Sequence, residues 1–139
     1  MGYAVGIVLA LIVSCFARVT GLDRDRAFYT TVAIVVASYY VLFAAMGGSS
    51  QALAVASIVM AAFIVVAMIG FKRNLWFVVA ALAGHGVLDL FHGTVVANPG
   101  VPEWWPAFCL TYDVGAAAFL AWLLMRSKLA AMTASRTAR

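Results

Sequence analysis

Five long apolar runs, separated by short polar segments, constrain this sequence more than any other feature. The runs cover about Tyr3–Val19, Ala27–Met46, Gln51–Gly70, Leu75–Ala97 and Ala107–Met125. A bilayer core about 30 Å thick requires roughly 20 apolar residues in helical form, and each run is close to that length. Only helices and closed barrels satisfy their backbone hydrogen bonds within lipid, and the alternating pattern of barrel strands is absent. The sequence therefore predicts an all-α integral membrane bundle of five transmembrane helices.

The composition excludes a water-soluble protein. Of the 139 residues, 66% are hydrophobic and only 10% are charged. A soluble chain of this size could not bury so much apolar surface, because small domains keep a large share of their surface in water. The net charge of +4 does not indicate a nucleic-acid partner, since the basic residues lie only at the ends of the apolar runs, between them or beyond them. The predicted partner is the lipid bilayer.

The basic residues also predict a topology, because they all fall on one side of a five-span arrangement. They are Arg18, Arg24, Arg26, Lys72, Arg73, Arg126, Lys128, Arg136 and Arg139. The positive-inside rule then places the N-terminus outside and the C-terminus in the cytoplasm of a plasma or inner membrane. Trp104 and Trp105 fit the outer interface. We expect residues 1–126 to form the transmembrane domain and residues 127–139 to form a basic cytoplasmic tail.

Strongly polar side chains are concentrated in the last two apolar runs. His85, Asp89 and His92 lie at i, i+4 and i+7, so they share one face of the fourth helix. Cys109 and Asp113 share a face of the fifth. The short connection makes the two helices antiparallel neighbours, so the two stripes can face each other. Counting about 1.5 Å per residue from the expected helix ends, we predict that Asp89, His92 and Asp113 share a level and that His85 lies furthest from Asp113.

The two aspartates need a compensating partner within the membrane. An ionised Asp at the centre of a span costs about 2.5–3.5 kcal/mol, and no Lys or Arg lies inside an apolar run except Arg18 at the end of the first. A divalent ion held by His85, Asp89, His92 and Asp113 would bring the net charge of the site near zero, with nitrogen and oxygen ligands that zinc, iron or manganese accept. Two other interpretations remain open. The residues could form a proton relay, or a neutral hydrogen-bonded knot that holds two helices together.

Four neighbouring side chains have simpler interpretations. Cys109 could be a soft ligand, but a buried cysteine usually behaves as a small hydrophobe. Tyr112 points roughly 100° away from Asp113 around the helix, which favours packing. Tyr39 and Tyr40 could line a pocket, although anchoring at the interface or packing is favoured for both.

The two motifs together resemble those of a family of small five-span membrane proteins, a domain of unknown function. H-x3-D-x2-H late in the fourth span precedes a proline-containing loop, and C-x3-D opens the fifth. Two positions depart from the family pattern, because Gly93 stands where members often carry a second histidine and Tyr112 where a cysteine is expected. These departures weaken a thiolate-rich or His-rich metal site and leave the set of two histidines and two aspartates intact. The resemblance implies no activity.

The leading functional hypothesis is a metal-dependent membrane enzyme that acts on a lipophilic small molecule. Asp89, His92 and Asp113 would hold the ion, zinc first and iron or manganese as alternatives, with His85 as a further ligand or a base. His85, Asp89 and Asp113 are therefore the candidate catalytic residues, for hydrolysis or another acid–base step. The alternatives are a metal-ion or proton transporter and a small structural subunit. Transport requires alternating access, for which five helices are few unless a homo-oligomer supplies more.

Overall fold

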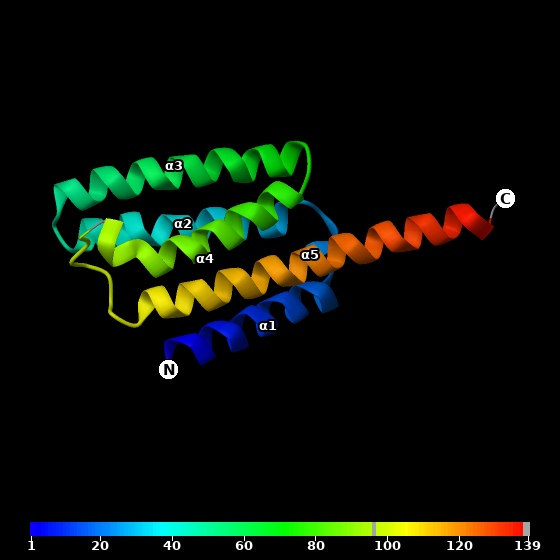
Figure 1. Ribbon diagram of the computed structural model, residues 1–139, viewed down its shortest axis with the longest axis horizontal. Coiled ribbons are helices and arrows are strands. Elements are labelled where there is room, and N and C mark those ends of the chain that lie inside the picture. The colour runs from blue at the N-terminus through cyan, green and yellow to red at the C-terminus, as the bar shows by residue number, and fades with distance from the viewer. Residues whose placement is uncertain (96, 138–139) are drawn as a thin grey trace.

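The protein is built from five long helices joined by short connections (Figure 1). A computed structural model describes residues 1–95 and 97–137. The helices are α1 (Gly2–Thr20), α2 (Ala27–Met46), α3 (Ser50–Lys72), α4 (Trp76–Val95) and α5 (Trp105–Thr137), with a short 3₁₀ helix, η1 (Leu22–Arg24), between the first two. No strand occurs among these residues. All five helices are long and apolar enough to cross a membrane, which confirms the predicted all-α class and indicates a multi-pass membrane protein.

The helix ends follow local signals in the sequence. Gly21 ends α1 in the left-handed conformation, with φ of 80°, a region that costs glycine little. The Ser49 side chain caps α3 by accepting a hydrogen bond from the backbone nitrogen of Ala52 at 3.2 Å. At the start of α2, the carboxylate of Asp25 accepts from the backbone nitrogen of Ala27 at 2.8 Å.

Consecutive helices run antiparallel, so α1 runs parallel to its packing partner α5, and the buried core is formed by α2, α3, α4 and α5 (Figure 1). Among the described residues, α1 packs on α5 alone of the long helices, whereas α2 packs mainly on α3. Small residues allow the close approach of α1, whose buried positions are Gly2, Gly6, Ala10, Ser14 and Ala17. A Cβ added to Gly6 would collide with the backbone oxygen of Phe108 on α5. This spacing of small residues is typical of helix interfaces inside membranes.

Large apolar side chains cover the outside of the bundle. Ile12, Ile58 and Leu90 are 58%, 71% and 59% exposed. Such a surface requires an apolar solvent, because a soluble monomer rarely leaves large contiguous apolar patches in water. The exposure pattern therefore agrees with the membrane assignment made from helix length.

The two ends of the bundle differ in chemistry. The ends of α1 and α3, the starts of α2 and α4, and the far part of α5 lie together at what we call the basic end, which carries Arg18, Arg24, Arg26, Lys72, Arg73 and Arg126 (Figure 1). The opposite end, the tryptophan end, carries Trp104 and Trp105. Beyond the bundle α5 continues as a helix through Lys128 to Thr137, whereas Arg139 of the predicted tail lies outside the described residues.

Candidate metal site

Four buried polar side chains lie on the inward faces of α4 and α5. His85, Asp89 and His92 on α4 are 2%, 4% and 8% exposed, and Asp113 on α5 is fully buried. The i, i+4, i+7 spacing thus turns the whole stripe inward, as the helical period requires. The prediction that the polar faces of the last two helices meet is confirmed.

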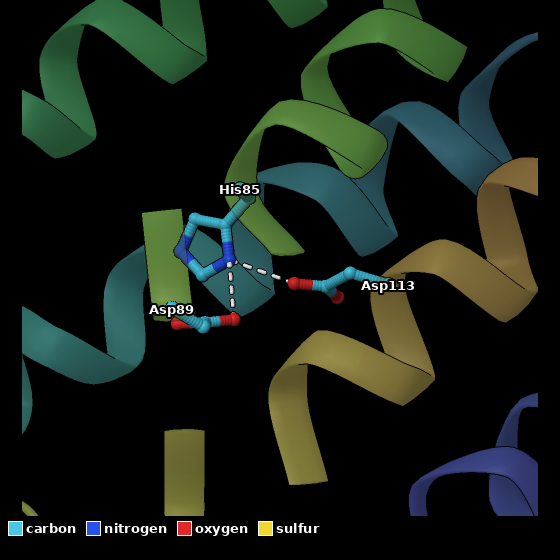
Figure 2. A group of neighbouring side chains, drawn as sticks. All are labelled: His85, Asp89 and Asp113. Carbon is cyan, nitrogen blue, oxygen red and sulfur yellow. Dashed lines mark hydrogen bonds and ion pairs between the residues drawn. The ribbon is translucent and has the colours of Figure 1, made fainter. Parts of the chain in front are cut away.

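The centre of the site is the imidazole of His85, which lies between two carboxylates (Figure 2). Its Nδ1 atom is 2.7 Å from Oδ2 of Asp113 and 3.7 Å from Oδ2 of Asp89. The hydroxyl of Tyr40, on α2, donates a hydrogen bond to Oδ1 of Asp89. Three helices therefore contribute to one polar cluster inside the bundle.

The donor atoms of this cluster fit a metal ion. His85, Asp89 and Asp113 each offer one ligand atom, and these atoms lie within 4.8 Å of one another. Two ligand atoms about 2.0 Å from a tetrahedral zinc ion lie about 3.3 Å apart, and the distances of 2.7 and 3.7 Å from Nδ1 bracket that value.

Unsatisfied oxygens point to the same conclusion. Oδ2 of Asp89 and Oδ1 of Asp113 are buried and have no hydrogen-bond partner among the described residues. No lysine or arginine lies inside the helices at this level. Buried carboxylate oxygens are costly when unpaired, so a cation or added protons must compensate them.

His92 lies apart from the candidate ligands. Its ring stacks on Tyr40, with ring centroids 3.8 Å apart, and its buried Nε2 has no hydrogen-bond partner among the described residues. It is outside the group of three that can share an ion. The prediction that His85 is furthest from Asp113 was wrong, because His85 is its direct hydrogen-bond partner.

The error has a simple geometric cause. α4 ends at Val95, two residues before the predicted end, and α5 begins at Trp105, two residues before the predicted start. Each difference of two residues shifts the predicted depth of its helix by about 3 Å. Together they shift α4 relative to α5 by about 6 Å, or one helical turn. This shift of one turn places Asp113 at the same depth as His85 and Asp89, and it leaves His92 nearer the tryptophan end.

Tyr40 is the site residue that sequence reasoning missed. Anchoring at the interface or packing was the favoured interpretation, yet the side chain is 4% exposed and contacts both Asp89 and His92. The connection between α4 and α5 holds its backbone in place, since Nδ2 of Asn98 donates to the Tyr40 carbonyl at 3.0 Å. A tyrosine inside a span, opposite unpaired carboxylates, was the available signal, because a buried phenol needs a partner.

A small cavity adjoins the cluster, and a larger groove lies one helical turn from Asp113 along α5. A small cavity of about 20 Å³ is lined by His85, His92 and Tyr40 together with apolar residues of α2, α3 and α4, and it has room for one water molecule. A larger groove of about 460 Å³ runs between α2 and α5 and is lined almost entirely by apolar and aromatic side chains. Cys109, fully buried one turn from Asp113, lines this groove, as do Tyr39 and Tyr112.

No protein-family model, curated protein or solved structure matches the chain. The resemblance of the two motifs to a family of unknown function therefore stays a prediction.

We expect Tyr40→Phe to destabilise the protein by about 1–3 kcal/mol, because it leaves Oδ1 of Asp89 without its donor. Tyr39→Phe is the matched control, since the Tyr39 hydroxyl makes no hydrogen bond among the described side chains and its ring packs on Trp105. Denaturant titration in detergent measures both free energies of unfolding. Equal effects of the two substitutions would contradict the assigned role of Tyr40.

Proposed function

We propose that the protein binds a divalent metal ion at His85, Asp89 and Asp113 and uses this site to act on a lipophilic molecule within the membrane. The observation that carries the proposal is the convergence of three buried ligand atoms within 4.8 Å, with two carboxylate oxygens left unpartnered. In an environment without lysine or arginine, a divalent cation would neutralise both carboxylates. The same ion would satisfy the oxygens that lack hydrogen bonds.

The donor set suits zinc first, with iron or manganese as alternatives. One imidazole nitrogen and two carboxylate oxygens are ligands that all three ions accept, and three protein ligands are typical of a catalytic site with an open position. When bound, such an ion would supply Lewis-acid polarisation of a carbonyl or phosphoryl oxygen. Tyr40 would orient Asp89 through its hydrogen bond, as outer partners orient metal ligands elsewhere.

The apolar groove between α2 and α5 supports a lipophilic substrate. It is about 460 Å³, a size that holds a small molecule or part of a lipid chain, and its polar lining is small. Cys109 separates the groove from Asp113 by one helical turn. A substrate in the groove would therefore reach the cluster by a local displacement of side chains near Cys109 and Tyr39.

The apolar core on the other side of the cluster supports an enzyme over a transporter. Val78, Leu82 and Leu120 lie toward the basic end and are 0%, 0% and 3% exposed. Among the described residues, no hydrogen bond or ion pair extends the polar chain of Tyr40, Asp89, His85 and Asp113 into this layer. The positive-inside rule supports a topology in which the site lies in the outer half of a plasma or inner membrane.

Elemental analysis of protein purified in detergent, without a nickel column or chelator, tests the proposal. We expect about one metal ion per chain in the wild type, loss of the ion in His85→Ala, and retention in His92→Ala, because only His85 belongs to the group of candidate ligands. Retention in His85→Ala with loss in His92→Ala would favour the ligand set expected from spacing alone.

Two further results would overturn the proposal. A wild-type protein without metal under these conditions would favour the proton relay or the structural knot. Flux of a metal ion or protons into vesicles, measured with a dye inside them, would favour transport.

A further inference from the structure

The basic end of the bundle contains a second large cavity, remote from the His/Asp cluster. It measures about 710 Å³ and lies between the α1–α2 connection, the start of α4 and the face of α5. Its rim carries four arginines, Arg18, Arg24, Arg26 and Arg126. Its apolar lining comes from Leu75, Leu120, Trp122, Leu123 and Leu124. We call this cavity the basic pocket.

The charges of the basic pocket are only partly compensated. Two aspartates stand against the four arginines. Asp23 lies 3.6 Å from Arg18, and Asp25 is engaged with the first backbone nitrogen of α2. Among the described side chains, no carboxylate lies within 4.0 Å of Arg24, Arg26 or Arg126, so the rim retains an excess of positive charge.

The arginine rim and the apolar lining of the basic pocket together favour one class of ligand. Guanidinium groups bind phosphate through several hydrogen bonds at once, and leucines of α5 continue from the rim into the membrane-spanning region. The guanidinium of Arg126 lies 4.6 Å from the Trp122 ring centroid, an arrangement common where a helix enters the polar interface. A soluble anion would contact the arginine rim alone, whereas a phospholipid would contact both the rim and the apolar lining.

We propose that the basic pocket binds an anionic phospholipid, with its phosphate between the arginines and the first part of an acyl chain on the leucines. Basic pockets between transmembrane helices are known to take such headgroups, and anionic lipids are concentrated in the leaflet that positive loops face. The proposal does not depend on the metal site, since the two sites share no residue.

Short-chain lipids test this binding on the purified protein in detergent. We expect dioctanoyl phosphatidylglycerol to raise the melting temperature more than dioctanoyl phosphatidylcholine at equal concentration. Arg24→Gln/Arg26→Gln should weaken the phosphatidylglycerol affinity by about tenfold or more. Lys72→Gln/Arg73→Gln is the matched control, because it removes the same charge from the same end of the bundle outside the pocket lining.

Three results would overturn the proposal. Equal stabilisation by both lipids would show that the arginines do not select an anion. An equal loss of affinity in the Lys72/Arg73 control would indicate general attraction to a charged surface, and full stabilisation by inorganic phosphate would indicate a soluble anion. If Arg24→Gln/Arg26→Gln fails to fold, Arg126→Gln at the other side of the pocket repeats the test.

Discussion

Asp113→Asn should abolish the stabilisation that added zinc gives to the wild-type protein. The substitution keeps the size of the side chain but replaces a carboxylate, the fully buried member of the group that can hold an ion, with a neutral amide. A ligand that binds only the folded state at about 100 times its dissociation constant adds about 2.7 kcal/mol to the free energy of unfolding. We expect that gain in the wild type and almost none in Asp113→Asn, measured by denaturant titration with and without zinc.

Glu103→Gln is the control for this experiment. It removes one negative charge in the same way, but Glu103 is exposed in the connection between α4 and α5. Its stabilisation by zinc should equal that of the wild type. Stabilisation of Asp113→Asn by the full wild-type amount would place the zinc elsewhere and would exclude Asp113 as a ligand.

The sequence predicted the helices well because each apolar run has its own end signals. Gly21 follows the first run, the Gly47–Ser50 turn follows the second, and Lys72 and Arg73 follow the third. Length and hydropathy are sufficient where the solvent is lipid, since each spanning segment must be a helix. The continuation of α5 to Thr137 was not predicted. An apolar run indicates only the part of a helix that lies in lipid, and the last part of α5 is polar.

The site was harder to predict than the helices. Spacing within one helix correctly placed His85 and Asp89 on the same face, because the helical period is fixed. The level of Asp113 depended on where two helices end, and an error of two residues at each end displaced the pairing by one turn. Tyr40 comes from α2, which is separated from Asp89 by 49 residues, so no local pattern connects the two.

The remaining question is whether the cluster serves function or only holds α4 to α5, and a double-mutant cycle on His85 and Asp113 answers it. Each single substitution to Leu leaves the other partner buried and unpaired, so we expect each to cost about 3–5 kcal/mol in the metal-free protein. The double variant removes both members of this pair and leaves Asp89 with its hydrogen bond from Tyr40. We expect its free energy of unfolding to lie within about 1 kcal/mol of the wild type, because replacing a buried ion pair with hydrophobic residues is often neutral or stabilising.

Such a recovery of stability in the double variant, together with loss of metal, would mean that stability does not require the pair and that the protein retains it for chemistry. A double variant that remains several kcal/mol less stable than the wild type would instead assign the cluster to holding the helices together.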